Sequence, residues 1–397
     1  MLIAGEASGD LLAAELVEAL RREFAEAPGA PTPDAQPRET SLEPRFFGAG
    51  GPRLAAAGVE VAFDLATHSV IGPTDALKGL FKFRRFFQQL FRLAIRRQPD
   101  VIICVDYQFF NRRFAHALKR YCRARADWFH DWRPRVVQYV SPQVWASREG
   151  RAYQMDEDYD LLLSILPFEK DWYARRVPEL KVEFVGHPLL ERHSASSEKN
   201  GERKAAAGKP VVVLLPGSRR GELRRHIPVL VEVARRVTAT REVTFLMVLP
   251  NESLVEYAKP LKAHLPAFQW QIGDLGEALK GATVAITKSG TASLECALFG
   301  VPAVVFYKTS QITYLLGKQV VKVKHIAMPN LLANETVYPE FIQEAASAEN
   351  LTRATLELLE SSERRAQVQG QLARVSAMLG TPGASTRAAK AILRLLD

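Results

Sequence analysis

The stretch VVVLLPGSRRGELRRHIPVL, residues 211–230, begins with an apolar run, continues through a Pro-Gly-Ser-Arg turn and ends in a helical pattern. An apolar run of this kind is typical of a strand that is buried on both faces in a parallel sheet. The stretch IAGEASGDLLAAELVEAL, residues 3–20, has the same order of strand, glycine-containing turn and helix. Each half of the chain therefore carries the strand–turn–helix unit of a Rossmann-like domain.

Short runs rich in β-branched residues alternate with helical patterns along the whole chain. Further examples are VIICVD (101–106), VVQYVS (136–141), TFLMVLP (244–250) and ATVAIT (282–287). This alternation predicts βαβ units and an α/β fold. The polar segment ERHSASSEKNGERKAAAGKP (191–210) is typical of a linker and divides the chain in two. We therefore expect two Rossmann-like domains facing a central cleft, with ligands beyond the carboxyl ends of the strands.

The composition narrows the class of protein. With 397 residues, 47% of them hydrophobic and 24% charged, the chain is typical of a globular protein with substantial cores. The net charge of +9 favours polyanionic partners: nucleic acid, an anionic membrane surface or phosphorylated substrates. The three cysteines lie far apart and predict buried free thiols in a reducing compartment.

The hydropathy pattern gives an expectation about location. The start MLIAGEASGD is too short an apolar stretch for a signal peptide. No apolar run reaches the roughly 18 residues that a membrane span needs. We expect a cytosolic protein that at most lies on a membrane.

Two turns in the second half of the chain could hold an anionic ligand. After the strand at 211–215, backbone N–H groups, the Ser218 hydroxyl and the Arg219 guanidinium together suit a diphosphate. After ATVAIT, the turn SGT (289–291) opens a helix whose N-terminus favours an anion, and Glu295 could accept hydrogen bonds from a ribose or sugar diol. The alternatives are a surface turn with solvated arginines and hydroxyl groups that only cap the helix.

Two turns in the first half carry carboxylates. In AGEASGD (4–10), Gly5 and Gly9 could make no more than a tight turn, but Glu6 and Asp10 suit a polar, hydroxyl-rich ligand. Asp106 follows the run VIICV, at the edge where a parallel sheet presents side chains to ligands. It could act as a general base toward an attacking hydroxyl, or it could simply cap the next helix.

Several kinds of site have no support in the sequence. The eight histidines form no HxxxH, HxH or His/Cys cluster, so we expect no metal. The acidic run MDEDYD (155–160) is more typical of a solvated turn than of a cation site. Neither GxSxG nor GxxxxGK[ST] occurs, which argues against hydrolases of that type and against P-loop NTPases. We expect no cofactor.

The segment LKGLFKFRRFFQQLFRLAIRRQ (77–98) contains five phenylalanines, seven Lys or Arg residues and no acid. As a helix it separates an apolar stripe from a basic face, and its excess of aromatic residues favours an interfacial membrane helix. The residues expected to contact the membrane are Leu80, Phe83, Phe87, Leu90, Lys82 and Arg85. The alternatives are an amphipathic helix buried on its own domain and, with no recognised module to support it, nucleic-acid binding.

Eight segments form a specific set of motifs. They are AGEASGD (4–10), FFGAGGPRLAAAGVE (46–60), YVSPQVWASREGR (139–151), ILPFEKDWY (165–173), FVGHPLL (184–190), LLPGSRRGE (214–222), SGTASLECAL (289–298) and MPNLLANE (328–335). In these motifs and in their order over nearly the whole chain, the sequence resembles the lipid-A-disaccharide synthase family, inverting glycosyltransferases of Gram-negative bacteria.

The resemblance implies a GT-B fold and a metal-independent reaction. In that reaction 2,3-diacylglucosamine passes from its UDP derivative to 2,3-diacylglucosamine 1-phosphate (lipid X), giving a β-1,6 linkage and UDP. The resemblance also implies a protein peripheral on the inner leaflet of the inner membrane, and a possible homodimer formed by exchange of C-terminal segments. Residues 1–190 would form the acceptor- and membrane-contacting domain, and 205–364 the UDP-sugar domain. Helices at about 365–397 would pack back on the first domain or on a partner subunit.

The resemblance also assigns roles to single residues. Asp106 matches the aspartate of the family's strand-end motif and is the candidate base. The other assigned residues are Ser218, Arg219, Ser289, Gly290 and Thr291 for the diphosphate, Glu295 for the ribose, Asn330 facing the cleft, and Glu6, Ser8 and Gly9 on the acceptor side. The chain has YQFFN (107–111) and VWASR (144–148) where the family shows APDFN or similar and VWAWR, so we expect the acceptor loop to differ there.

Two other functions stay open at this point. A UDP-sugar 2-epimerase would share the fold and the nucleotide-binding residues, although the hydrophobic segment 77–98 argues against it. A non-catalytic, basic membrane- or RNA-binding protein would use the same scaffold in degenerate form. The intact PGSR and SGTASLE motifs and Asp106 argue against degeneration, and we expect no nucleic-acid partner.

Overall fold

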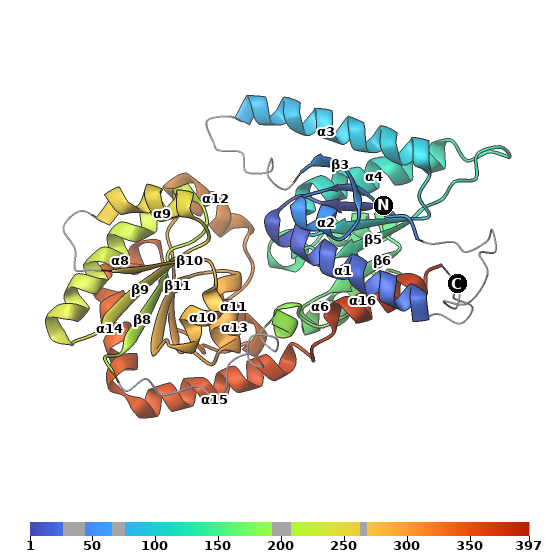
Figure 1. Ribbon diagram of the computed structural model, residues 1–397. Helices are drawn as coiled ribbons and strands as arrows, with labels where there is room; N and C mark the ends of the chain where they lie inside the picture. Colours follow the sequence, from blue (N-terminus) through green and yellow to red (C-terminus); the bar gives the residue numbers. More distant parts are fainter. Residues whose placement is uncertain (27–43, 66–75, 193–207, 263–267, 397) are drawn as a thin grey trace, which may run out of the picture. The chain divides into compact units, whose positions relative to one another are not determined.

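Figure 1 shows the computed structural model, which describes residues 1–26, 44–65, 76–192, 208–262 and 268–396, without the side chains of 76–82, 262 and 316. The chain divides into two units, Met1–Pro188 with Thr381–Asp397, and Leu189–Gly380. Each unit is built on its own parallel sheet with helices on both faces. The predicted α/β class with two Rossmann-like domains is therefore confirmed.

The first unit has a seven-stranded sheet in the order β3-β2-β1-β4-β5-β6-β7, in which every strand pair is parallel. Its strands are β1 (Leu2–Ala4), β2 (Phe47–Gly50), β3 (Glu60–Asp64), β4 (Val101–Val105), β5 (Arg135–Tyr139), β6 (Leu161–Ser164) and β7 (Val182–Phe184). Its α-helices are α1 (Ala7–Glu26), α2 (Pro52–Ala56), α3 (Ala76–Arg97), α4 (Gln108–Ala124), α5 (Arg151–Asp158), α6 (Pro167–Ala174) and α16 (Ala384–Leu393). The central strands β4 and β5 are buried on both faces, which explains their nearly unbroken apolar sequences.

The second unit has a six-stranded parallel sheet in the order β10-β9-β8-β11-β12-β13. Its strands are β8 (Val211–Leu215), β9 (Thr244–Leu249), β10 (Gln269–Ile272), β11 (Val284–Lys288), β12 (Ala303–Tyr307) and β13 (Glu340–Ile342). Its α-helices are α8 (Arg220–Thr240), α9 (Glu252–Ala258), α10 (Leu275–Lys280), α11 (Thr291–Leu298), α12 (Gln311–Val320), α13 (Met328–Ala333), α14 (Ala348–Glu360) and α15 (Ser362–Met378).

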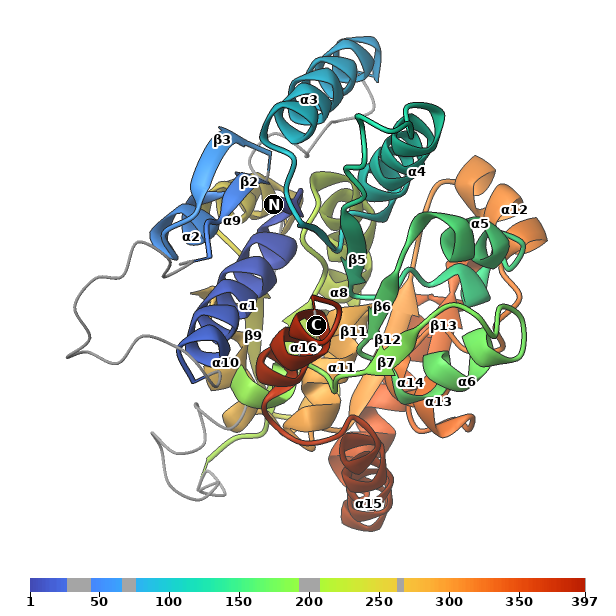
Figure 2. The same ribbon diagram turned by 90° about the vertical axis from the view of Figure 1, so that its right-hand side faces the viewer.

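The two C-terminal helices divide between the units. Helix α15 belongs to the second unit and packs on α11, α13 and α14. Helix α16 returns to the first unit and lies beside α1 in both views (Figures 1 and 2). Ala388 and Ile392 of α16 are buried in the same cluster as Leu16 of α1, and Arg387 Nε donates to the Val185 carbonyl at 2.8 Å. Within the predicted segment 365–397, only the part from Thr381 onward therefore packs on the first unit.

Helix α3 turns its aromatic stripe inward, onto α4. The Phe83 and Phe110 ring centroids are 5.1 Å apart, and those of Phe87 and Phe114 are 5.8 Å apart. Leu90 is completely buried. The prediction that Leu90 contacts a membrane is therefore wrong, and the rings of Phe83 and Phe87 are engaged in packing α3 on its own unit.

The remaining residues of this prediction divide into two groups. Arg85 is exposed, together with Arg84, Arg92 and Arg96 on the outer face of α3. The side chains of Leu80 and Lys82 lie outside the described residues. Within the part of the chain that is described, no helix combines the length and the apolar character that crossing a membrane requires.

Candidate active site

The chain leaves β4 through two consecutive residues in the left-handed region, Asp106 at φ 50° and Tyr107 at φ 37°. This backbone conformation is unfavourable for residues with a side chain, so neighbouring contacts must hold it. The Asp106 N–H donates to the Tyr139 carbonyl at 2.9 Å. The Asp106 carbonyl accepts from Asn111 Nδ2 at 2.9 Å and from Gln138 Nε2 at 3.1 Å. The strained turn thus sets the direction of the Asp106 side chain at the carboxyl end of the sheet.

The turn between β1 and α1 packs closely against this strand end. A Cβ atom on Gly9 would lie 3.5 Å from the Asp106 Cβ, and one on Gly5 would lie 2.0 Å from the Tyr107 ring. Gly5 is therefore required by the approach of Tyr107. Because of this close packing, Glu6, Ser8 and Gly9, which the sequence predicts on the acceptor side, gather beside Asp106.

The Asp106 carboxyl group is half-buried, and Ser8 Oγ lies 3.5 Å from its Oδ2. Burial raises the pKa of Asp106 above its ordinary value, and the negative charge of Glu6 raises it further. Hydrogen bonds from the Tyr107 backbone and the Ser8 hydroxyl act in the opposite direction. A raised pKa makes the carboxylate a stronger base, which suits proton abstraction from a hydroxyl.

Asp10 has a different role from the one expected. Its carboxylate is buried and accepts three backbone hydrogen bonds, from Gly51 at 2.6 Å, Arg53 at 3.0 Å and Leu54 at 3.2 Å. These N–H groups belong to the first turn of α2 and the residue before it, where no intrahelical acceptor exists. Asp10 therefore caps α2, and the prediction that it meets a hydroxyl-rich ligand is wrong.

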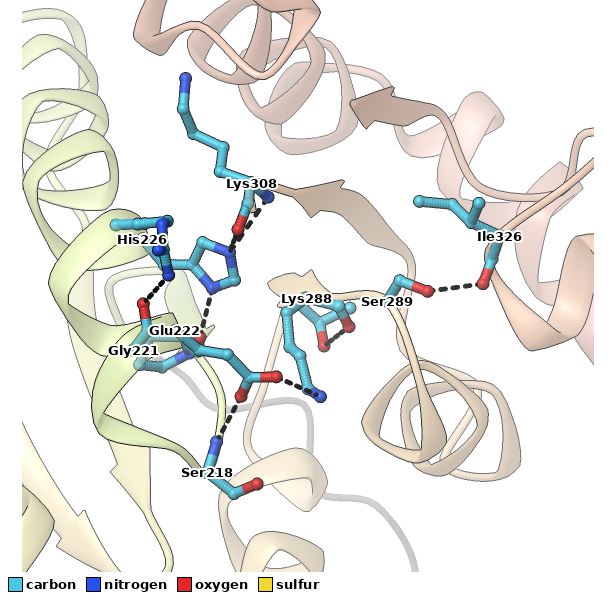
Figure 3. A network of polar contacts seen from close by, with 11 residues as sticks. Ser218, Gly221, Glu222, His226, Lys288, Ser289, Lys308 and Ile326 are labelled. Atoms are coloured by element: carbon cyan, nitrogen blue, oxygen red, sulfur yellow. Dashed lines mark hydrogen bonds and ion pairs between the residues drawn. The ribbon is translucent and has the colours of Figure 1, made fainter. Parts of the chain in front are cut away.

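In the second unit, the PGSR turn follows the end of β8 (Figure 3). Ser218 and Arg219 are both exposed there, just before α8. The Ser218 N–H donates to Glu222 Oε2 at 3.0 Å, and Lys288 Nζ at the end of β11 lies 3.2 Å from Glu222 Oε1. The buried carboxylate of Glu222 thus joins two neighbouring strand ends. Lys288 brings a second cation close to the turn that carries Arg219, and no local sequence motif marks this lysine.

His226 joins the same turn to a third strand end (Figure 3). Its buried ring contacts the Pro216 carbonyl through Nδ1 at 2.6 Å, and its Nε2 lies 3.1 Å from both the N–H and the carbonyl of Lys308. A carbonyl can only accept, so Nδ1 carries a hydrogen. Burial lowers the pKa of His226, which favours the neutral ring, and in that form Nε2 accepts from the Lys308 N–H. His226 therefore aligns the ends of β8 and β12 around the PGSR turn.

The SGT turn follows β11 and opens α11. Gly290, at φ 128°, precedes the helix, and no side chain caps the first turn of α11. Ser289 Oγ donates to the Ile326 carbonyl at 2.6 Å, and Thr291 is exposed at the first helical position. One turn further on, burial raises the pKa of Glu295 to about 7, although the positive charge of Arg192 lowers it in part. The turn has the positive helix end and hydroxyl groups that an anionic sugar nucleotide needs.

Asn330 is not a ligand-facing residue. It is completely buried, and its Nδ2 donates to the Tyr338 carbonyl and to Glu340 Oε1, both at 2.7 Å. Its Oδ1 accepts from the backbone N–H groups of Val337 at 3.0 Å and Tyr338 at 2.8 Å. Glu340 in turn accepts from the backbone at Ile326, whose carbonyl binds Ser289. The prediction that Asn330 faces the cleft is therefore wrong: Asn330 braces the segment that holds the SGT turn.

A buried carboxyl group lies behind the SPQVWA loop of the first unit. Glu169 Oε1 accepts from Trp145 Nε1 at 2.9 Å, and its Oε2 lies 2.7 Å from Ser164 Oγ. Ser164 has a single hydroxyl hydrogen and also contacts the Leu166 carbonyl at 2.7 Å, so a protonated Glu169 satisfies both contacts. Burial raises the pKa of Glu169 to about 7, which agrees with this arrangement. The LPFE motif itself gives no sign of this role, because the burial of Glu169 comes from tertiary packing.

The described residues offer no metal centre. Among them, no three His, Cys, Asp or Glu side chains come together in a way that could hold a metal ion. Arg219 and Lys288 are cationic groups near the PGSR and SGT turns that could balance a diphosphate.

Comparison with known proteins identifies the family. A family model described as lipid-A-disaccharide synthetase matches residues 1–393. The lipid-A-disaccharide synthase of Syntrophus aciditrophicus is 36% identical over 405 residues, covering 100% of this chain and 97% of that protein. The lipid-A-disaccharide synthase of Myxococcus xanthus is 36% identical over 406 residues, with the same coverage.

The chain belongs to the lipid-A-disaccharide synthase family. It is therefore a glycosyltransferase of lipid A biosynthesis, and the family resemblance drawn from the motifs is confirmed. Family membership also decides between the functions that the motifs left open, because neither an epimerase nor a non-catalytic scaffold is needed to explain them.

Solved structures similar to this lipid-A-disaccharide synthase family member show its fold. A UDP-GlcNAc 2-epimerase from Neisseria meningitidis bound to UDP-GlcNAc has a TM-score of 0.60 and 12% identity, covering 96% of each chain. The glycotransferase of kitacinnamycin has a TM-score of 0.57 and 15% identity, covering 100% of this chain and 98% of that one. The GT-B fold is thus shared by glycosyltransferases and epimerases, and at these identities the likeness is one of fold alone.

Proposed function

We propose that the chain transfers 2,3-diacylglucosamine from UDP-2,3-diacylglucosamine to 2,3-diacylglucosamine 1-phosphate, with inversion, and releases UDP. Family membership supports the class of reaction. The observation that carries the proposal is Asp106, a half-buried carboxylate with a raised pKa, held by a strained turn at a strand end beside the hydroxyl of Ser8. These are the properties of a base that activates a sugar hydroxyl.

In the proposed reaction, Asp106 takes the proton of the acceptor 6-hydroxyl as its oxygen attacks the anomeric carbon of the donor. A new C–O bond forms on one face of the donor sugar while the bond to the UDP oxygen breaks on the other. The electron pair of the broken bond goes to the diphosphate. Because the displacement is a single step, the anomeric configuration inverts and gives the β-1,6 linkage. Asp106 then releases its proton to water.

The leaving diphosphate gains one further negative charge as the bond to the sugar breaks, and the protein must balance that charge. We assign this to Ser218, Arg219, Lys288 and the N-terminus of α11 at Gly290 and Thr291. A Cβ atom on Gly290 would lie 3.6 Å from Lys288 Nζ, so the ammonium group lies against the helix N-terminus. Glu222 holds Lys288 in this position. Glu295, one turn into α11, would accept hydrogen bonds from the UDP ribose.

We also propose that the first unit lies on an anionic membrane surface, the inner leaflet of the inner membrane, because both substrates carry acyl chains. The turn after α4 supports this, since Trp128 is 95% exposed and Phe129 is 86% exposed. The turn is held in shape, because Asp127 Oδ1 accepts from the Phe129 N–H at 2.8 Å and contacts His130 Nδ1 at 2.9 Å. Aromatic side chains presented in this way are typical of residues that enter a membrane interface.

The outer face of α3 supports the same proposal. A surface groove of about 820 Å³ between β3 and α3 has apolar walls from Phe63, Phe86 and Leu93. Its rim carries three arginines, Arg85, Arg92 and Arg96. Each cation close to an anionic leaflet contributes on the order of 1 kcal/mol of binding free energy. The membrane contact thus falls on the basic side of α3, and the phenylalanine stripe lies on the other side.

A homodimer remains a further proposal. Helix α16 packs on α1 within one chain, with Lys390 Nζ 3.7 Å from Glu23 and Arg394 paired to Glu183. Two glycines with positive φ, Gly380 and Gly383, flank the segment that leads into α16. Exchange of α16 between two copies would reuse the same contacts. Light scattering of the purified protein measures whether two chains associate.

The deciding experiment is incubation of the purified protein with UDP-2,3-diacylglucosamine and lipid X, followed by mass analysis of the product and NMR assignment of the new anomeric centre. We expect a disaccharide 1-phosphate with a β linkage. Asp106→Asn should lose transfer by about 10²-fold or more, since general base catalysis contributes roughly 10²–10⁴-fold. A fully active Asp106→Asn variant, or turnover of UDP-N-acetylglucosamine without lipid X, would contradict the proposal.

A further inference from the structure

Four arginines gather at one corner of the first unit. Arg112 and Arg113 lie on α4, and Arg148 and Arg151 lie at the end of the SPQVWA loop and the start of α5. Arg151 lies within electrostatic reach of the other three, whose positive charges act on it. Helices α4 and α5 are in contact, and Arg112 Nη2 donates to Gln154 Oε1 at 2.9 Å. We call these four residues the arginine cluster.

The arginine cluster lacks a neutralising acid among the residues that the structure describes. In the described part of the chain, the side-chain hydrogen bond that the cluster makes is the one from Arg112 to the neutral amide of Gln154, and the Nε–H of Arg112 is buried without an acceptor. The nearby carboxylate of Glu149 pairs with Arg176 at 3.5 Å instead. Burial lowers the pKa of Arg151, and the charges of Arg112, Arg148 and Arg113 lower it further. Guanidinium groups without a paired carboxylate repel one another, and a bound anion would relieve that repulsion.

The cluster lies on the catalytic side of the sheet. Helix α4 begins two residues after Asp106, and Arg112 follows Asp106 by six positions, about 9 Å along a helix axis. Helical side chains lean toward the N-terminus, so those of Arg112 and Arg113 lean back toward the strand end. The loop that carries Arg148 follows β5, the neighbour of β4 in the sheet. The arginine cluster therefore follows the same carboxyl edge of the sheet as Asp106.

Exposed aromatic rings lie beside the charges. Phe109 is 62% exposed, and the Arg113 guanidinium lies over its ring at 3.7 Å. Tyr153, on α5 two positions after Arg151, is also 62% exposed. Phe109 also contacts Phe83 of α3, with ring centroids 5.6 Å apart. Positive charge and exposed apolar surface thus occur together, which suits a ligand that has both a phosphate and hydrocarbon chains.

We infer that the arginine cluster is the binding site for the phosphate monoester of the acylated acceptor sugar, with Phe109 and Tyr153 against its hydrocarbon portion. This inference rests on the proposed function, because it takes the acceptor to be a sugar 1-phosphate. Guanidinium groups bind a terminal phosphate through paired N–H donors, and four of them balance its two charges. With the phosphate held at the cluster, the far end of the same sugar, which carries the 6-hydroxyl, points back to Asp106. The cluster therefore selects the acceptor and orients it.

The test compares two acceptors in detergent micelles free of phospholipid: 2,3-diacylglucosamine 1-phosphate and 2,3-diacylglucosamine without the phosphate. The variants are Arg113→Gln and the double variant Arg148→Gln/Arg151→Gln. We expect KM for the phosphorylated acceptor to rise roughly tenfold to a hundredfold in the double variant, with KM for the other acceptor nearly unchanged. The matched control is Arg120→Gln, because Arg120 is exposed on the same face of α4 two turns further from the strand end and is expected to change neither value.

Two further measurements distinguish the possible failures. Thermal unfolding of the double variant should occur at the same or a higher temperature, because repulsion is removed; a structural role for the arginines predicts a lower one. Binding of lipid X in micelles can be measured by calorimetry without the donor, so it tests the arginine cluster separately from the reaction. If the wild-type protein binds lipid X but forms no disaccharide, only the proposed function is overturned. An unchanged preference for the phosphorylated acceptor overturns the inference. So does loss of binding to phosphatidylglycerol vesicles with that preference intact, which would make the cluster a lipid head-group site.

Discussion

Replacing Asn330 by alanine tests whether this residue stabilises the fold from the core or contacts a ligand. The change removes an acceptor from the Val337 and Tyr338 N–H groups and a donor from the Tyr338 carbonyl. Each buried group left without a partner costs about 1–3 kcal/mol. Three such groups make a loss of at least about 3 kcal/mol in the free energy of unfolding, even where water enters the space. Glu340 keeps its two backbone donors, so its carboxylate adds little to this figure.

The measurement is thermal unfolding of the purified protein, followed by UDP binding well below the midpoint. For a unit of this size, a loss of about 3 kcal/mol lowers the midpoint by roughly 6–12 °C. UDP affinity of the folded fraction should change little, since the amide reaches no solvent. Asn251→Ala is the matched control: Asn251 is exposed and accepts one cap bond from the Leu254 N–H at 3.0 Å, so its loss costs about 1 kcal/mol.

A second substitution sharpens the same test. Asn330→Asp keeps the oxygen that accepts from Val337 and Tyr338 but sets a new carboxylate against Glu340 Oε1 and the Tyr338 carbonyl. We expect it to be at least as destabilising as alanine at pH 7 and to recover as the pH falls and the carboxyl group takes up a proton. An unchanged unfolding midpoint together with a tenfold loss of UDP affinity would refute the brace and restore Asn330 to the ligand site.

Three other predictions follow from the structure. Glu169 has a pKa of about 7 in the folded chain and an ordinary value of 4.5, so between these pH values it holds its proton only in the folded state. The free energy of unfolding should therefore fall by up to roughly 3 kcal/mol as the pH rises from about 4.5 to about 7. Glu169→Gln should flatten that slope in urea unfolding at several pH values, and an identical slope would assign it to another group. Gly5→Ala should abolish most transfer with a smaller loss of stability, because its Cβ would lie 2.0 Å from the Tyr107 ring next to Asp106; wild-type turnover would show that the ring moves freely. The double variant Trp128→Ser/Phe129→Ser should lower binding to anionic vesicles about tenfold or more with an unchanged unfolding midpoint. Phe87→Ala, in contrast, should lower the midpoint. If the double variant binds vesicles as the wild type does, the aromatic turn is not part of the membrane contact.

Much of the fold could be predicted from local patterns. The runs at β4, β5 and β8 are apolar on both faces because both faces are covered by helices, and that property is visible residue by residue. Strand ends in a parallel sheet share one edge, so a polar residue just after such a run is a site candidate without any coordinates. Asp106, Ser218 and Arg219 lie where this reasoning puts them.

Residues that the sequence misassigned are those whose partners lie far away in the chain. Asp10 and Glu6 occupy the same short motif, yet Asp10 caps a helix more than 40 positions away and Glu6 stays beside Asp106. Asn330 follows the same pattern, since its amide is satisfied by the segment 337–340 that folds back over it. No local pattern in the sequence distinguishes a side-chain amide that hydrogen-bonds to the backbone from one that binds a ligand, because both use the same donors and acceptors.

The sequence by itself determined the α/β class, the division into two sheets, the family and the strand-end position of the candidate base, because these depend on periodicity and short motifs. Tertiary structure alone decided which polar groups are free to act. It turned the phenylalanines of α3 inward and left its arginines outside, because α4 supplies an aromatic surface that only one face of α3 can cover. It also brought together four arginines from two helices and a loop, with no paired carboxylate among the residues that the structure describes, since electrostatic neighbours are set by packing and not by order in the chain.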